Sequence, residues 1–329
     1  MVFEIKGCFM YYKSDIVEQN YNNDSNNKKY GSKRKMKWIN EVQGTIFASF
    51  PVLRFILFGF IPLVFGLLMA FLPMKYNFDI GLAMEQGFTL DNFRMVLKDA
   101  TFWKSIWNTF YLALAWPISM LIALLVSILL TKNIKGKPFF RTVYFIPFIC
   151  SLVAVTLMWN VILDYNYGVA NNVIEWLTGT RINWRGDPKW YRFGLICMTV
   201  WSTTGYKIII LTAALTSVNK SLYEAAELDG ANAFQKVKSV TLPAISPTIF
   251  YLFVTGLIDV LQEFTRSQVW DRKGGPNSTG ITMVFYLYRE AFTYSNMGTA
   301  SAVAWILSII IVIITIFNFV FSKKWVHYD

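Results

Sequence analysis

The sequence predicts an all-α, polytopic membrane protein with about six transmembrane helices. Of its 329 residues, 55% are hydrophobic and only 16% are charged, whereas soluble domains hold about a quarter charged residues. The apolar residues are also gathered into runs of about 20, the length that a helix needs to cross the hydrocarbon core. These runs cover residues 53–73, 106–130, 143–163, 193–218, 248–270 and 299–322.

The net charge of +11 is distributed in a way that indicates membrane topology and argues against nucleic-acid binding. Lysine and arginine are concentrated on one predicted side of the membrane, which marks that side as cytoplasmic. Loops on the other side mix basic residues with acids such as Asp79 and Glu85. Both termini are therefore predicted to be cytoplasmic. The basic residues of the cytoplasmic side are Lys28, Lys29, Lys33, Arg34, Lys35, Lys37, Lys132, Lys135, Lys137, Arg141, Lys220, Lys236, Lys238, Lys323 and Lys324.

Residues 1–50 are predicted to form a disordered cytoplasmic tail. The stretch YNNDSNNKKYGSKRKMK is polar, basic and low in complexity, so we expect it to lie near anionic lipid headgroups. A regulatory docking role is the open alternative. Residues 51–104 are expected to hold the first transmembrane helix and an external amphipathic segment, in which Asp91 caps a helix that places Phe93, Val96 and Leu97 on one face.

No catalytic residue and no metal site is predicted. Cys8, Cys150 and Cys197 show no paired spacing, and two of them fall inside apolar runs, where a packing role is expected. The single histidine, His327, lies in the predicted cytoplasmic tail 323–329. A histidine-based metal site or catalytic triad is therefore not expected, and the chain is not predicted to be an enzyme.

A charged stretch, SLYEAAELDGANAFQKVKSVTLP, separates the fourth and fifth apolar runs. Ser221 and Glu224 have the spacing of a capping box, which predicts a short helix that ends at Gly230, the residue type best suited to a left-handed terminus. Asn232 and Gln235 are predicted to begin a second helix.

The second helix is predicted to end at Leu242-Pro243. Residues 219–245 thus form a predicted helix–turn–helix on the cytoplasmic face of the membrane. Ala225 and Ala226 would leave a flat patch that another protein's backbone can approach closely. A docking element and a helical surface linker are the two interpretations of this stretch.

The same stretch resembles the motif of permease subunits of bacterial ABC importers. That motif is Glu-Ala-Ala, three residues, Gly, nine residues, an aliphatic residue, any residue and Leu-Pro, often with an acid before the glycine. FFRTVYFIP, INWRGDP, GGPNSTGITMVFYLYREAF and MGTASAVAWIL are also similar to the carbohydrate-importer branch, in its maltose-type first-permease group. The motif positions here are Glu224, Ala225, Ala226, Asp229, Gly230, Val240, Leu242 and Pro243.

The resemblance implies a type I importer permease fold over residues 105–322 and a division of labour among subunits. Partners would be a second homologous permease, two copies of an ABC ATPase and an external solute-binding protein that delivers a sugar. The helix–turn–helix would be the coupling element that docks on the ATPase. Glu224 would be its polar anchor, Ala225 and Ala226 would pack closely against the ATPase, and Gly230 would form the turn between the two helices. The location would be the bacterial cell membrane.

The chain holds no phosphate-binding loop of the G-x-x-x-x-G-K-[ST] type. ATP and Mg²⁺ would therefore be bound by the partner ATPase, and no cofactor is expected in this chain.

Four ionisable residues lie within the fourth and fifth apolar runs: Lys207, Asp259, Glu263 and Arg266. Charges inside a bilayer are costly and normally face a cavity or a partner. Asp259 and Glu263 are four residues apart, and Glu263 and Arg266 have the spacing of an ion pair on a helix. The group therefore either lines a substrate path or holds helices together.

Trp159, Asn160 and Trp201 are further candidates for a sugar site, because sugars combine hydroxyl groups with apolar faces. Ordinary packing or interfacial anchoring is the alternative for the tryptophans. Lys207 stands where the family usually has asparagine, so the charge of the substrate stays open.

Two other classes of protein compete with the importer permease. An ion-coupled secondary transporter is compatible with the buried charges, although no internal repeat is visible. A membrane scaffold accounts for a cytoplasmic docking element but not for the buried charges. Binding of an ABC ATPase would separate the importer from both.

Overall fold

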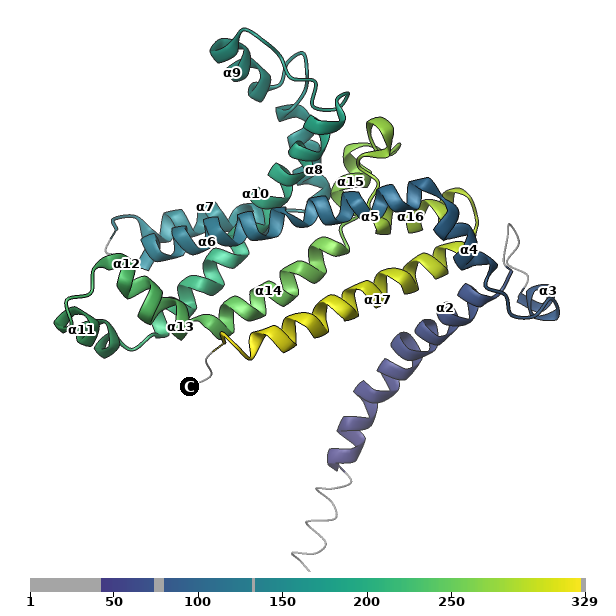
Figure 1. The fold of residues 1–329 in the computed structure, drawn as a ribbon, viewed down its shortest axis with the longest axis horizontal. Helices are drawn as coiled ribbons and strands as arrows, with labels where there is room; N and C mark the ends of the chain where they lie inside the picture. The colour runs from purple at the N-terminus through teal and green to yellow at the C-terminus, as the bar shows by residue number, and fades with distance from the viewer. Residues whose placement is uncertain (1–42, 74–79, 132–133, 327–329) are drawn as a thin grey trace, which may run out of the picture. The chain divides into compact units, whose positions relative to one another are not determined.

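The computed structural model describes residues 43–73, 80–131 and 134–326, and these ranges contain helices and loops but no strand (Figure 1). The chain divides into two compact units, residues 1–66 and residues 67–329. The helices are η1 (Ile56–Phe60), α2 (Ile61–Phe71), α3 (Ile80–Glu85), α4 (Asp91–Lys98), α5 (Ala100–Ala113), α6 (Ala115–Thr131), α7 (Lys137–Ile149), α8 (Leu152–Ile162), α9 (Val169–Thr178), α10 (Pro188–Ser217), α11 (Lys220–Leu228), α12 (Ala233–Lys236), η2 (Val237–Thr241), α13 (Leu242–Ala244), α14 (Ser246–Leu261), α15 (Thr265–Trp270), η3 (Pro276–Ser278), α16 (Met283–Tyr288), η4 (Arg289–Thr293) and α17 (Met297–Ser322).

The predicted all-α, polytopic class is confirmed, because the described residues form five single helices that are long and apolar enough to span a membrane, plus one bent pair. The third predicted span, residues 143–163, is a bent pair of helices: α7 and α8 are bent by 101° at the break between them. Pro147 lies inside α7, which continues to Ile149, and the break falls at Cys150 and Ser151, whose backbone is extended. The five single helices are Gln43–Phe71, Ala100–Thr131, Pro188–Ser217, Ser246–Trp270 and Met297–Ser322.

The described part of the first unit is helical. Residues 43–50 are helical, so the predicted disordered tail is wrong for its last eight positions, whose sequence QGTIFASF contains no proline. Residues 1–42 lie outside the described part of the chain. The side chains of residues 43–58 are exposed and many are apolar, for example Phe47 at 80% and Phe58 at 79%. An apolar exposed surface of this kind suits a lipid environment.

The first core of the second unit is built around α10, a helix of 30 residues that packs against α6 and α7. Gly205 faces the backbone carbonyl of Tyr144, so the two helices approach each other more closely than any side chain would allow. Ser127 of α6 donates to the Ile208 carbonyl at 3.1 Å. Small and hydroxyl-bearing residues at helix contacts are typical of membrane bundles.

The second core lies where α4, α5, α16 and α17 meet. The predicted helix after the first span exists as α4, but its buried face differs from the predicted one. Val96 is fully buried, whereas Leu97 is 50% exposed. Asn92 is buried as well, because its amide donates to the Ala70 and Leu72 carbonyls at 3.0 and 2.8 Å. The helix therefore packs against protein and is not laid freely on a membrane surface.

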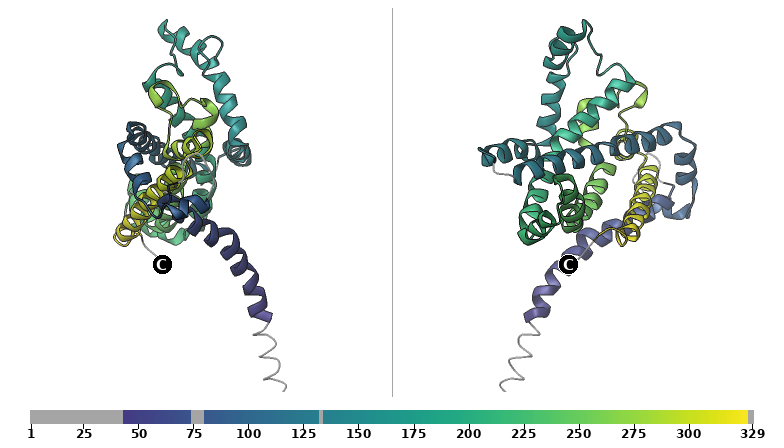
Figure 2. Two further views of the ribbon diagram at one scale, coloured as in Figure 1. Left: turned by 90° about the vertical axis from the view of Figure 1, so that its right-hand side faces the viewer. Right: turned by 60° about the vertical axis from the view of Figure 1, so that its left-hand side comes forward.

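The two ends of the second unit carry different elements. Helices α11, α12 and α13 gather at one end, together with the end of α10 and the beginning of α14 (Figures 1 and 2). Helices α4, α15 and α16 lie toward the other end, and α9 projects from the bundle beyond α8, at the top of the view (Figure 1). The predicted coupling element thus lies at the end opposite to α4 and α16.

Candidate functional site

The first helix of the predicted coupling element begins differently from the prediction. The N-cap of α11 is Asn219, whose side chain accepts from the Ser221 backbone N–H at 3.0 Å. Ser221 and Glu224 therefore do not form the predicted capping box. Asparagine is among the strongest N-cap residues, and it stands two positions earlier. Glu224 is consequently exposed on the outside of the helix.

The turn between the two helices is the predicted one. Gly230 has φ +76°, a left-handed conformation that residues with a side chain rarely adopt. The Ala231 N–H donates to the Ala226 carbonyl and the Gly230 N–H to the Glu227 carbonyl, which is a Schellman termination. Asn232 then caps α12 through a capping box with Gln235, as predicted.

The second helix does not end at Leu242-Pro243, so this part of the prediction is wrong. The chain continues from α12 through a π-helical turn, η2, into α13, which ends at Ala244. The Leu242 N–H bonds to the Val237 carbonyl across five residues. After this widened turn, Pro243 stands in the first turn of α13, where its missing N–H is not needed.

Two side-chain contacts hold the two helices together. Lys236 forms an ion pair with Glu227 at 2.8 Å, and its hydrogen bond holds the pKa of the Glu227 carboxyl below its ordinary value. The Tyr223 hydroxyl lies 3.0 Å from the Thr241 hydroxyl. These contacts fix the relative orientation of α11 and η2.

The coupling element presents a surface with an unusual share of exposed apolar side chains. Leu228 is 91% exposed and Phe234 is 75% exposed. Glu224, Ala225, Asp229 and Gly230 are exposed beside them, whereas Ala226 is half-buried. Large apolar side chains that water fully surrounds are typical of a surface that binds another protein.

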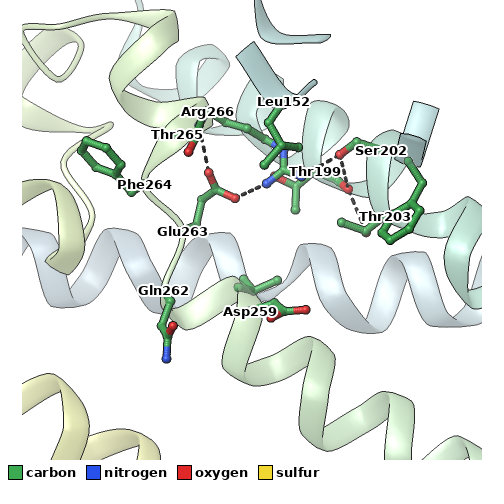
Figure 3. A pocket seen from close by; sticks show the side chains of 12 residues that line it. Leu152, Thr199, Ser202, Thr203, Asp259, Gln262, Glu263, Phe264, Thr265 and Arg266 are labelled. Carbon is green, nitrogen blue, oxygen red and sulfur yellow. Dashed lines mark hydrogen bonds and ion pairs between the residues drawn. The ribbon is translucent and has the colours of Figure 1, made fainter. Parts of the chain in front are cut away.

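A cavity of about 430 Å³ lies among α8, α10, α14 and α15 (Figure 3). Its wall combines charged groups, hydroxyl groups and aromatic rings. Three of the four ionisable residues singled out in the sequence, Asp259, Glu263 and Arg266, line it together. The full set of lining residues is Phe148, Leu152, Thr199, Ser202, Thr203, Asp259, Val260, Gln262, Glu263, Phe264, Thr265 and Arg266.

Glu263 and Arg266 form the predicted ion pair, and both side chains are about 95% buried. The helix does not run through them, however: α14 ends at Leu261 and α15 begins at Thr265. The Glu263 carboxylate also accepts from the Arg266 backbone N–H at 2.9 Å, and Arg266 donates to the Ser202 hydroxyl of α10 at 2.9 Å (Figure 3). The break thus turns both charged groups toward each other and toward the cavity.

Lys207 lies on α10 one helical turn after Thr203 and does not line the cavity itself. Its ammonium donates to the Ser119 hydroxyl at 2.7 Å and to the Thr203 hydroxyl at 3.1 Å, and Thr203 lines the cavity. The side chain is buried, whereas Asp259 is exposed to the cavity. Among the described residues, Lys207 and Asp259 form no ion pair within 4.0 Å.

Trp159, Asn160 and Trp201 are not among the residues that line the charged cavity. The rings of Trp159 and Trp201 meet edge to face with centroids 5.9 Å apart. Trp201 lines a different, mostly apolar cavity of about 530 Å³ beside Tyr144 and Pro147. The Nε1 atom of Trp159 and the Oδ1 atom of Asn160 are buried without a partner among the described residues. A role in the substrate path stays a prediction for all three.

The sequence interpretation missed the hydroxyl groups that complete the charged cavity. Thr199, Ser202 and Thr203 share one face of α10, at the helical spacing i, i+3 and i+4. This polar stripe within an apolar run was a readable signal, although only the structure brings it opposite Glu263 and Arg266.

A family model described as "Binding-protein-dependent transport system inner membrane component" matches residues 110–327. The chain belongs to this family, whose members are membrane components of ABC importers. It is a transport subunit and not an enzyme, and it is a multi-pass membrane protein that works with a solute-binding protein.

Curated relatives extend over most of the chain. It is 33% identical to the probable ABC transporter permease protein YesP of Bacillus subtilis, over 87% of this chain and 92% of that protein. It is 32% identical to the arabinooligosaccharides transport system permease protein AraP of Halalkalibacterium halodurans, over 80% and 83%. The lactose transport system permease protein LacF of Rhizobium radiobacter is 25% identical, over 89% and 98%.

The fold is also found in solved structures. A bacterial alginate ABC transporter in complex with an alginate pentasaccharide-bound periplasmic protein is similar, with a TM-score of 0.66, 25% identity and coverage of 83% of this chain and 91% of that chain. The type I importer architecture that the resemblance implied is therefore confirmed by the fold.

Proposed function

We propose that this chain forms half of the transmembrane path of an ATP-driven importer for sugars or oligosaccharides. The observation that carries the proposal is the exposed turn at Gly230, with Glu224 and Ala225 beside it, at the end of the second unit opposite to α15 and α16. Relatives named for arabinooligosaccharide and lactose transport support the substrate class. None of the relatives named above is an ion-coupled transporter.

The partners in this proposal are a second homologous permease, two copies of an ABC ATPase and an external solute-binding protein. The coupling element, residues 219–245, docks on one ATPase subunit, with Glu224 as polar anchor, Ala225 and Ala226 as the closely packed face and Leu228 and Phe234 as apolar contacts. Leu242 and Pro243 connect this element to α14 through η2 and α13. ATP and Mg²⁺ are held by the ATPase subunits, and this chain needs no cofactor.

The path runs through the charged cavity and is used by alternating access. Closure of the ATPase subunits moves α11 and α12, and the short connection through α13 passes this movement to α14, whose far end carries Asp259. The loaded binding protein docks at the opposite end, the path opens toward it, and hydrolysis of ATP returns the path to the inward-facing state. In this orientation the coupling element and both termini are cytoplasmic, and Lys207, Asp259, Glu263 and Arg266 contribute to the path.

The test is an ATPase and co-purification assay on the complete complex in proteoliposomes. Glu224→Ala is expected to reduce ATPase binding or its stimulation by the loaded binding protein about tenfold, because a hydrogen-bonded charged anchor at an interface centre is worth 1.4 kcal/mol or more. Glu85→Ala, which removes an exposed carboxylate from α3, is the matched control and should change neither quantity. Unchanged binding and stimulation in the Glu224 variant would refute the coupling role.

The substrate class is tested in the same vesicles. Uptake of a labelled oligosaccharide that depends on both ATP and the binding protein is expected. Uptake of amino acids or peptides, with no oligosaccharide transported, would refute the carbohydrate assignment while leaving the family membership intact.

A further inference from the structure

A third cavity, of about 570 Å³, touches the wall of the charged cavity and differs from it in charge. We call it the cationic pocket and define it by Gln268, Arg272, Lys273, Tyr288, Arg289 and Tyr294. Arg272 and Lys273 directly follow the span Ser246–Trp270, and Arg289 precedes the span Met297–Ser322. The pocket therefore lies where these two spans end, since Gln268 belongs to the last turns of Ser246–Trp270. Helix α16, which carries Tyr288, lies toward the end of the second unit that is opposite to α11 and α12 (Figure 1).

The two cavities share a wall. Phe264 lines the charged cavity, and its ring packs on Tyr288 of the cationic pocket with centroids 4.8 Å apart. Gln268 of the cationic pocket and Arg266 of the charged cavity are two residues apart on α15, so they face opposite sides of this helix. The Phe264–Tyr288 contact is therefore the part of the wall that both cavities touch.

The cations of the cationic pocket form no direct ion pair. None of Arg272, Lys273 and Arg289 lies within 4.0 Å of a carboxylate of the described residues. The acids beside them in the chain have other partners: Asp271 accepts the Lys273 backbone N–H at 2.8 Å, and Glu290 accepts the Asn296 amide at 3.1 Å. In the charged cavity, by contrast, Arg266 pairs directly with Glu263. Three cations in one pocket repel one another and favour an anionic ligand.

The rest of the pocket indicates what kind of anion fits. Arg289 donates to the Tyr294 hydroxyl at 2.6 Å and lies over the Tyr294 ring at 5.5 Å, so the guanidinium is held in one place. Gln268 offers an amide for the hydroxyl groups of a sugar, and the Tyr288 ring, which packs on Phe264 and Phe292, forms part of the pocket wall. Arginine pairs with a carboxylate through two parallel hydrogen bonds.

We propose that the cationic pocket binds the carboxylate of an acidic saccharide, such as a uronate-containing oligosaccharide, before it enters the charged cavity. This inference rests on the proposed function and names its substrate class. Arg272, Lys273 and Arg289 pair with the carboxylate, and the Gln268 amide binds hydroxyl groups of the sugar. In the charged cavity beyond, the one arginine of the lining is already paired with Glu263, so the carboxylate is bound in the cationic pocket.

The test measures binding to the complete transporter in nanodiscs of zwitterionic lipid, without binding protein. The probes are trigalacturonate and its fully methyl-esterified form, which has the same linkages and no charge. Trigalacturonate is expected to bind at least tenfold more tightly than the ester. Lys273→Gln and Arg289→Gln should each weaken trigalacturonate binding about tenfold and leave the ester unchanged, because each removes one charge-assisted contact.

Two controls separate a binding role from a structural one. Lys98→Gln removes an exposed cation at the end of α4 and should change nothing. Arg289→Lys keeps the charge but cannot donate two parallel hydrogen bonds to a carboxylate. Its affinity for trigalacturonate should therefore lie between those of Arg289→Gln and the parent chain. Lys273 is exposed and its side chain forms no ion pair with the described residues, so its variant remains informative if Arg289→Gln disturbs the fold.

Several results would overturn the inference. Equal affinity for trigalacturonate and its ester, or insensitivity to both variants, would refute it. If Lys273→Gln and Arg289→Gln lower the ATPase activity that the binding protein stimulates with an uncharged substrate, the pocket contacts the binding protein instead. If added phosphatidylglycerol competes with trigalacturonate for the pocket, the pocket binds a lipid headgroup instead. If trigalacturonate does not bind but vesicles still import a neutral oligosaccharide, only this inference fails; if no oligosaccharide is imported, the proposed function fails.

Discussion

The coupling element and the charged cavity are both polar regions of an apolar chain, but they are held together in opposite ways. In the coupling element the hydrogen bonds join residues close in sequence: Asn219 to Ser221, Asn232 to Gln235 and Lys236 to Glu227. In the charged cavity Arg266 reaches Ser202, which is 64 residues away. The first region is exposed, whereas the ion pair of the second is buried.

The comparison predicts where a substitution will lower the stability of the protein most. An exposed region made of local contacts loses one contact when one residue changes, and water replaces it. A buried pair leaves an uncompensated charge when one partner is removed. We therefore expect damage in the cavity to appear as lost stability, and damage in the coupling element to appear as lost communication between subunits.

The largest effect is expected for Arg266→Met. It leaves the buried Glu263 carboxylate without its partner, which costs about 3 kcal/mol. The measurement is thermal unfolding of the purified complex in detergent. The double variant Arg266→Met with Glu263→Leu removes both charges and should recover most of the loss. If the single variant is as stable as the parent chain, the buried pair does not hold the break between α14 and α15.

Next in size is Gly205→Ala. Its new methyl group would meet the Tyr144 backbone carbonyl, so α7 and α10 must move apart at a cost of about 2 kcal/mol. Gly66→Ala is the control, since nothing lies within 4 Å of the added carbon there. Unfolding in denaturant compares the two, and equal stability would show that the α7–α10 contact is looser than the structure describes.

Gly230→Ala is expected to cost about 1 kcal/mol, because alanine is strained at φ +76° while no atom lies within 4 Å of the new carbon. Gly87→Ala is a close match, with φ +77° and equally open space. Both variants should lose similar stability, but only Gly230→Ala should lower binding-protein-stimulated ATPase activity. A similar ATPase loss in both would mean that the turn at Gly230 has no special role in coupling.

The smallest effect concerns the Glu227–Lys236 contact. The pKa of Glu227 is lowered by the Lys236 hydrogen bond, so the contact stabilises the element above the ordinary carboxyl pKa and is lost as the pH falls through the lowered value. Amide hydrogen exchange of α11 and α12 should differ less than about twofold between the parent chain and Lys236→Gln at neutral pH, and not at all in acid. A difference that persists in acid would contradict this origin.

Sequence reasoning was most successful where structure depends on neighbours in the chain. The left-handed turn at Gly230 and the capping box of Asn232 and Gln235 were both predicted, because their hydrogen bonds span only a few residues. It failed where two local signals competed. Ser221 and Asn219 were both possible N-caps, and the stronger one, Asn219, begins α11. Pro243 was expected to end a helix, but the π-turn before it lets the helix continue.

The sequence by itself determined the class of protein, because apolar runs of about 20 residues predict membrane spans and their number. It also determined the position of the coupling element. Only the tertiary structure decided which polar residues share a cavity. It joined Glu263 and Arg266 with Ser202, placed Trp159 and Trp201 elsewhere, and put three cations beside Phe264 and Tyr288. The physical reason is that packing between distant helices, and the breaks after Ile149 and Leu261, set which side chains meet.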